Sequence, residues 1–235
     1  AVGISALSSD TLGSKSVAIG RRSLFTQNFT TATDSYNTAV GFETGYSITT
    51  GKFNTLIGGL AGDAITTAVR NVAVGYEALS TTQLGDYSVA VGDGALKTQN
   101  FATATNAYNV AVGASAGTAV TTAVENTLIG GNAGDALTTG GSNVAVGFGA
   151  LTTEDTGSRN VAIGYEALEN QNSDTTNYNV VVGYQAGRNV TTGIQNTILG
   201  GLAGDALTDA DYNVAIGTSA LGADTLGSRA VAIGR

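Results

Sequence analysis

Apolar residues in this sequence recur in runs of three that end at a glycine, as in Val72-Ala73-Val74-Gly75. Side chains alternate between the two faces of a strand, so the outer residues of a run point one way and the middle residue points the other way. The outer positions hold Val, Thr, Ile or Leu, and the middle position holds Ala, Leu, Val or Ile. Both faces are therefore apolar, which predicts short strands that are covered on both sides.

The runs return at a nearly constant spacing. Successive closing glycines are 17 residues apart, except for two intervals of 21 and one of 19. The fourteen closing glycines are Gly3, Gly20, Gly41, Gly58, Gly75, Gly92, Gly113, Gly130, Gly147, Gly164, Gly183, Gly200, Gly217 and Gly234. A short fixed period is typical of repeat architectures. We therefore predict an all-β, parallel β-solenoid of about 13 coils, each 17 residues long.

A second period lies over the first one. The residue four places after the closing glycine is Leu in two copies and then Gly in two, and each long interval follows the second Leu copy. We interpret residues 1–235 as a single solenoid domain with four-coil super-repeats at about 20–91, 92–163 and 164–234. The chain opens and stops inside a motif and has no Met, which favours a slice of a longer protein.

Two further features of the coil are expected from the sequence. In the Gly copies an apolar residue such as Ile48 or Ile65 precedes Thr-Thr, which predicts a second strand in those coils. Asn precedes most of the apolar runs, for example Asn37, Asn71 and Asn143. Stacking of the coils would align these side chains, so we predict a structural ladder of amides.

The motifs Ser-Val-Ala-Ile-Gly at 16–20, Asn-Thr-Leu-Ile-Gly at 54–58 and Asn-Val-Ala-Val-Gly-Tyr-Glu-Ala-Leu at 71–79 resemble a known group of repeats. They look like the head repeats of trimeric autotransporter adhesins, and more closely like repeats of phage tail fibres. Adhesin heads use shorter coils, so the period favours the tail-fibre-like group. The resemblance implies a left-handed, parallel β-roll in which three chains pack around one axis.

The two faces of the strands lead to a prediction about that trimer. Alanines dominate the middle position, as at Ala111 and Ala145, and small side chains permit close packing between chains. We therefore predict that the alanine face meets neighbouring chains. The outer residues, such as Val110 and Val112, would then fill the interior of each coil.

Composition narrows the possible chemistry. The chain carries 10 basic and 18 acidic residues, a net charge of −8, and no His or Cys. This acidity argues against a nucleic-acid partner, and no apolar run is long enough to insert into a membrane. A His- or Cys-based nucleophile and base are lacking, and Glu77, Glu154 and Glu166 look scattered along the chain. We therefore expect no enzyme activity.

A Gly-rich pattern and a Thr-rich pattern each suggest a possible type of binding site. The Gly-Gly-Leu-Ala-Gly-Asp motif at 58–63 is similar to calcium-binding repeats, but its matching aspartates Asp63, Asp135 and Asp205 are four coils apart. A carboxylate cage cannot close over that distance. Pairs such as Thr66-Thr67 could suggest an ice-binding array, although strand propensity explains them better. We predict no metal and no cofactor.

The long intervals contain insertions, which we name the first (25–36), second (97–108) and third (169–178) insertions. Loops on a rigid scaffold often carry recognition. The candidate surface contacts are Phe29, Tyr36, Phe101, Tyr108 and Tyr178. The alternative is that the insertions pack on the adjacent coil, with their aromatic rings as plugs.

The hypothesis that follows is a structural segment of an extracellular, homotrimeric attachment fibre, on a phage tail (virion) or a bacterial surface, that supports host or surface adhesion. Two alternatives remain. One is a head that itself binds a cell-surface glycan or protein receptor. The other is a monomeric β-solenoid enzyme or ice-binding protein.

Overall fold

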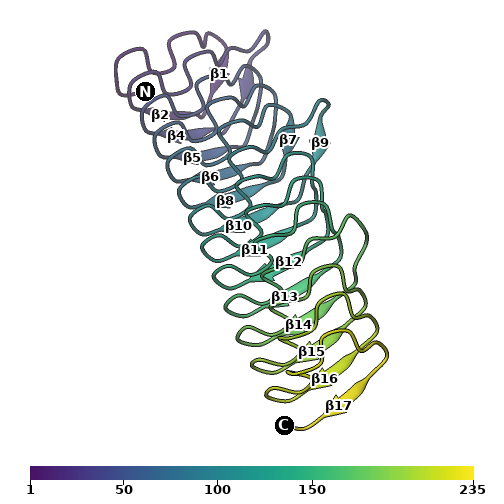
Figure 1. Ribbon diagram of the computed structural model, residues 1–235. Coiled ribbons are helices and arrows are strands. Elements are labelled where there is room, and N and C mark those ends of the chain that lie inside the picture. Colours follow the sequence, from purple (N-terminus) through teal and green to yellow (C-terminus); the bar gives the residue numbers. More distant parts are fainter. The chain divides into compact units, whose positions relative to one another are not determined.

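The computed structural model describes residues 1–235 as two compact units, Ala1–Thr122 and Ala123–Arg235. Each unit is a parallel β-solenoid in which one three-residue strand per coil pairs with the strand of the next coil (Figure 1). The register places equivalent residues opposite each other, as for Ala73 and Ala90. No helix is present. The predicted all-β solenoid and its 17-residue period are confirmed.

The strand bounds follow the apolar runs of the sequence. In the first unit the main strands are β2 (Val17–Ile19), β4 (Thr38–Val40), β5 (Thr55–Ile57), β6 (Val72–Val74), β8 (Val89–Val91) and β10 (Val110–Val112). In the second unit they are β11 (Thr127–Ile129), β12 (Val144–Val146), β13 (Val161–Ile163), β14 (Val180–Val182), β15 (Thr197–Leu199), β16 (Val214–Ile216) and β17 (Val231–Ile233).

Four further strands belong to the first two insertions and the coils before them. β1 (Gly13–Ser14) pairs with β3 (Thr33–Asp34), and β7 (Gly85–Asp86) pairs with β9 (Thr105–Asn106). The prediction of a second strand in every Gly copy is wrong, because no strand forms at the apolar residue that precedes Thr-Thr. Ile48 lies in a turn, where its N–H donates to the Gly45 carbonyl at 3.2 Å, and its side chain is buried. These apolar residues serve the core and not a strand.

The assignment of the two strand faces is also wrong. The middle residue, including Ala111 and Ala145, is fully buried inside the coil. The outer residues are half-buried or exposed, as Val110 and Val112 are. The interior of a 17-residue coil is narrow, and it is filled mainly by residues from its other sides, so alanine fits at most middle positions. We call the middle residues the inner face and the outer residues the outer face.

The core is filled by an exchange between Leu and Gly copies. In a Leu copy, Leu79 adopts φ 52° and turns its side chain into the core. In a Gly copy, Gly62 has φ +56°, and a Cβ there would lie 2.8 Å from Ile65 and 2.9 Å from Leu56. The space left by the missing leucine side chain is thus filled by an apolar residue three places later, here Ile65, and by a large middle residue, here Leu56. This exchange explains the four-coil super-repeat.

The closing glycine is required for the coils to stack. Gly75 has φ +140°, and a Cβ at this position would collide with the carbonyl oxygen of Gly92 in the next coil. An L-residue is strained at such a φ, and here it would also prevent the close approach of the two backbones. The same pair of constraints recurs in each unit, which is why the motif always ends at glycine.

The amide ladder is confirmed within both units. The Asn54 side-chain oxygen accepts from the Asn71 backbone N–H at 3.0 Å, and its Nδ2 donates to the Ala68 carbonyl at 3.0 Å. In the second unit, Asn143 Oδ1 accepts from the Asn160 N–H at 2.9 Å. These buried amides form hydrogen bonds with backbone groups at the turn before each strand. Those backbone groups lie outside the strand-to-strand hydrogen bonds.

Candidate functional site

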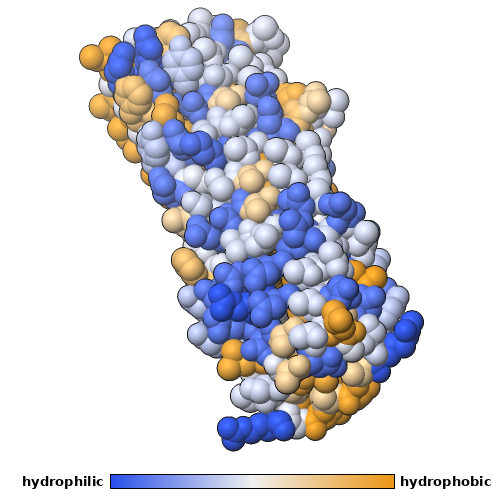
Figure 2. Space-filling view, in the orientation of Figure 1, coloured by the Kyte–Doolittle hydropathy of each residue, from blue (hydrophilic) through white to orange (hydrophobic).

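The outer face forms an apolar ladder on the surface of each unit. Its most exposed members are Val17, Ile19, Ile57 and Val112 in the first unit, and Ile129, Ile163, Val180, Val231 and Ile233 in the second. Figure 2 shows hydrophobic side chains gathered over the last coils, where β17 lies, while much of the remaining visible surface is pale or hydrophilic. An ordered apolar stripe of this kind is typical of a surface that packs against another protein.

A second ladder carries aromatic and basic side chains. It occupies the position two residues before each main strand, and this residue adopts a positive φ in coil after coil. In the first unit the column runs through Lys15, Tyr36, Phe53, Arg70, Tyr87 and Tyr108, with ring-to-ring and cation-to-ring distances of 5.0–5.7 Å. In the second unit the pairs are Arg159 with Tyr178 and Arg229 with Tyr212. Stacking and cation–π attraction therefore hold these exposed rings in fixed positions.

The second unit has a shorter aromatic stack after the closing glycine. Phe148, Tyr165 and Tyr184 occupy consecutive coils, with centroids 5.8 Å and 5.5 Å apart and ring planes within 16° of parallel. The rings face one another, so their edges point to solvent. A sugar binds an aromatic ring by stacking on its face. The faces within this stack are covered by the neighbouring rings, so they cannot bind a sugar.

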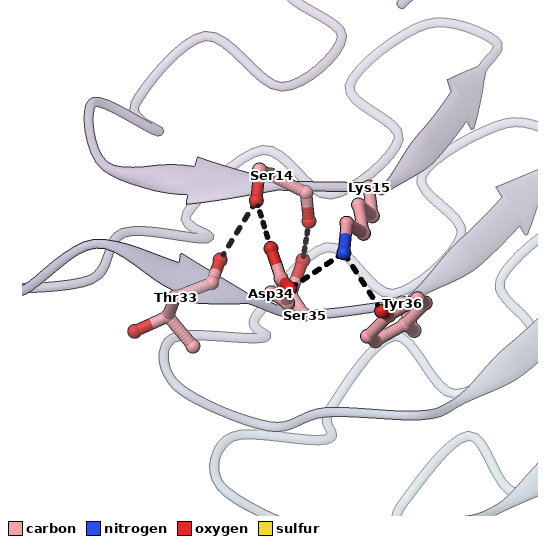
Figure 3. Close-up of polar contacts among 6 residues, drawn as sticks. All are labelled: Ser14, Lys15, Thr33, Asp34, Ser35 and Tyr36. Atoms are coloured by element: carbon pink, nitrogen blue, oxygen red, sulfur yellow. Dashed lines mark hydrogen bonds and ion pairs between the residues drawn. The ribbon is translucent and has the colours of Figure 1, made fainter.

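Polar contacts fix the first insertion to the preceding coil (Figure 3). Lys15 Nζ donates to Asp34 Oδ2 at 2.6 Å and to the Tyr36 hydroxyl at 2.9 Å, and Ser14 Oγ donates to Asp34 Oδ1 at 2.6 Å. The hydrogen bonds from Lys15 and Ser14 lower the pKa of Asp34, and those to Asp34 and Tyr36 raise the pKa of Lys15. Both charged side chains are about half exposed. The cluster orients Tyr36 on the surface.

The structure divides the five predicted surface contacts into two groups. Tyr36, Tyr108 and Tyr178 are about half exposed and belong to the aromatic and basic columns. Phe29 and Phe101 are only 6% and 7% exposed, so the prediction that they form surface contacts is corrected. Phe101 packs on Gly85, where a Cβ would lie 2.9 Å from its ring. These two rings are plugs, as the alternative interpretation proposed.

The third insertion has a different interior. Ser173 stands at the place of Phe29 and Phe101, and the fully buried Glu154 stands where the earlier coils have Asp10 and Thr82. Glu154 Oε1 accepts from the Gly157 N–H at 2.6 Å and the Ser173 N–H at 3.4 Å, and Oε2 accepts from Asn177 Nδ2 at 3.1 Å. Burial raises the pKa of Glu154, although these hydrogen bonds oppose the shift.

Sequence reasoning did not single out this polar region. In the sequence Glu154 is one of several scattered acids, and no local pattern marks Asp155 or Asp174. The signal was present, because the third long interval is 19 and not 21 residues, and Ser173 breaks the Asn-Phe pair of the other two insertions. An alignment of the three super-repeats against one another would have found it.

The structure contains no group of three or more His, Cys, Asp or Glu side chains that could hold a metal ion. It also contains no helix with the length and apolar character that a membrane span requires. Comparison of the chain with protein-family models, with curated proteins and with solved structures finds no match.

Proposed function

We propose that this chain is a structural segment of an extracellular, homotrimeric attachment fibre, of a phage tail or a bacterial surface. The observation that carries the proposal is the apolar outer face, which repeats coil after coil in each unit. The resemblance of the repeats to those of tail fibres and trimeric adhesins supports the same assembly. Three copies of the chain would cover one another's outer faces.

The mechanism of such a segment is mechanical. Each coil bonds to the next through backbone hydrogen bonds, such as Gly75 N–H to the Ile57 carbonyl at 2.8 Å, and through the buried Asn ladder. A repeat array of this kind distributes its stability over nearest-neighbour contacts. It would hold a receptor-binding part away from the surface that carries it, and it would present few loops to proteases.

The test is the mass in solution of the parent and an outer-face variant, measured by light scattering. Ile129→Glu with Ile163→Glu places two carboxylates per chain on the exposed outer face of the second unit. We expect a trimeric parent and a folded monomeric variant, because unpaired charges in a dry interface cost several kcal/mol each. Thr153→Glu, at an exposed position outside the strands, is the control and should remain trimeric.

An inner-face variant separates folding from assembly. Ala111→Glu with Ala145→Glu should prevent folding altogether, since both side chains point into the interior of a coil. Circular dichroism of this variant would therefore show loss of the strand signal and not merely dissociation. A parent that is monomeric across the accessible concentrations would contradict the proposed fibre.

A further inference from the structure

The third insertion opens into a surface pocket of about 530 Å³, within the size range of small-molecule sites. The six residues that line this third-insertion pocket are Asp155, Asn172, Ser173, Asp174, Thr175 and Thr192. They come from three consecutive coils of the second unit. The pocket therefore belongs to one chain and needs no second copy to form it.

The pocket lies where the other insertions have an aromatic plug. Phe29 and Phe101 are buried at the equivalent place, and each of their insertions is two residues longer than the third. The paired strands that accompany the first two insertions are reduced in the third to a single bridge between Ser158 and Thr176. A shorter segment without its phenylalanine leaves a hollow that polar side chains line.

The lining is unusual because it contains only oxygen-rich polar side chains. The lining residues carry two carboxylates, three hydroxyls and one amide, and none of these residues is basic or aromatic. Asp155 Oδ1 is buried and has no hydrogen-bond partner, although a buried carboxylate oxygen normally has one. Thr156 Oγ1 donates to Asp174 Oδ1 at 3.2 Å. Acceptors thus outnumber the donors supplied by the protein.

The floor of the pocket is held in place by the buried cluster around Glu154. Ser173 Oγ donates to Asn177 Oδ1 at 2.8 Å, and Asn177 Nδ2 donates to Glu154. The Asn172 N–H donates to the Thr191 carbonyl at 2.9 Å, which fixes the insertion against the next coil. Because these bonds hold the floor in place, little ordering would be needed on binding.

This lining selects among ligand classes. An anion is disfavoured by Asp155 and Asp174, with no basic side chain in the lining to offset them. A compact metal site is disfavoured because no group of three acidic side chains converges here. A neutral sugar fits better, because its hydroxyls donate to carboxylates and both donate to and accept from the Ser, Thr and Asn side chains.

We propose that the third-insertion pocket binds one or two units of a neutral carbohydrate, with adjacent sugar hydroxyls donating to Asp155 and Asp174. This proposal rests on the proposed attachment function, because an attachment fibre would encounter glycans at a cell surface. With no aromatic ring in the lining, recognition would come from hydrogen bonds and would depend on hydroxyl configuration. Epimeric sugars should therefore differ in affinity.

The test is saturation-transfer NMR with a panel of neutral mono- and disaccharides, followed by titration of the sugar that gives the largest signal. We expect Asp155→Asn and Asp174→Asn each to weaken binding by about tenfold or more, because each removes a charged acceptor. Ser173→Phe restores the residue of the other insertions and should abolish binding. Asp93→Asn in the first unit is the matched control and should leave binding unchanged.

The inference would be overturned if no saccharide bound the parent, or if binding survived in the Asp155→Asn, Asp174→Asn double variant. Binding of spermidine or Ca²⁺ in place of any sugar would also overturn it, since the pocket would then be a cation site. Circular dichroism confirms that each variant is folded. Light scattering of the same samples separates this test from that of the fibre, because a monomeric parent that binds sugar would contradict only the trimer.

Discussion

The second and third insertions begin from the same scaffold and end with different interiors. In both, a buried glutamine, Gln99 or Gln171, accepts from the amide of the Asn that precedes the next strand, at 2.8 Å and 3.2 Å. The second insertion then buries Phe101, whereas the third places Ser173 there, above a buried carboxylate.

The coil therefore tolerates either an apolar or a polar interior beside the same strand ladder. The main strands pair in both coils, and Asn71 Oδ1 and Asn160 Oδ1 each accept from the backbone N–H before the next strand, although Asn160 Nδ2 is buried without a partner. What differs is local: a plug stabilises the second insertion by apolar burial, and hydrogen bonds to Glu154 stabilise the third. A solenoid can therefore acquire a pocket in one coil without disturbing its neighbours.

The largest effect is expected from removing the plug. Phe101→Ser should destabilise the first unit by about 3–5 kcal/mol, the range for deleting a buried aromatic side chain. Thermal denaturation followed by circular dichroism measures the loss. Tyr108→Ser, at a half-exposed ring of the same insertion, is the control and should lower the melting temperature much less. Equal effects of the two substitutions would mean that Phe101 is not a plug.

An intermediate effect is expected from the buried carboxyl of the third insertion. Burial raises the folded-state pKa of Glu154 above its ordinary value of 4.5, so the folded chain retains a proton that the unfolded chain has already lost. This contribution to stability is complete below pH 4.5 and is lost as the pH rises through the folded-state pKa. The melting temperature should therefore fall less between pH 5 and pH 8 in Glu154→Gln than in the parent.

The first unit supplies a matched measurement for this pH dependence. Burial also raises the pKa of Asp63, from 3.8 to about 6, and the nearby charges of Glu77 and Glu43 add to the shift. The parent should lose stability as the pH rises from about 4 to about 6, as Asp63 gives up its proton. In Asp63→Asn this loss should be smaller, as it should be in Glu154→Gln. If Glu154→Gln follows the pH profile of the parent throughout, the carboxyl in the third insertion is not held in a desolvated site.

The smallest effect is expected at the surface of the first insertion. Lys15→Ala removes the ion pair with Asp34 and the hydrogen bond to Tyr36, yet both charged groups are exposed and screened by salt. The melting temperature should scarcely change, and the small change should shrink further in high salt. A loss comparable with that of Phe101→Ser would show that the exposed cluster, and not the plug, holds the insertion.

Much of the fold could be predicted from the sequence because it depends on features that repeat. The closing glycine, the apolar run and the preceding Asn mark each coil, and stacking follows once the same pattern returns every 17 residues. Tyr36, Tyr108 and Tyr178 were predicted as surface contacts because they lie in the long insertions, and all three are about half exposed.

The candidate sites were less predictable because they depend on single departures from the repeat. Phe29 and Phe101 look like recognition residues in a loop, and only the packing of their rings inside the insertion shows that they are plugs. Ser173 matters because it replaces the phenylalanine of the other insertions and leaves the space of the ring open. Asp155 and Asp174 become neighbours of one pocket only because consecutive coils stack.

The sequence by itself determined the period, the positions of the main strands, the all-β class and the Asn ladder, since each follows from local patterns repeated many times. The tertiary structure decided which face of the strand is the interior. Alternation distinguishes two faces but cannot rank them when both are apolar. The width of the coil settles the choice: Ala73 fits in the buried interior, and Val72 and Val74 are left half-buried on the outer face.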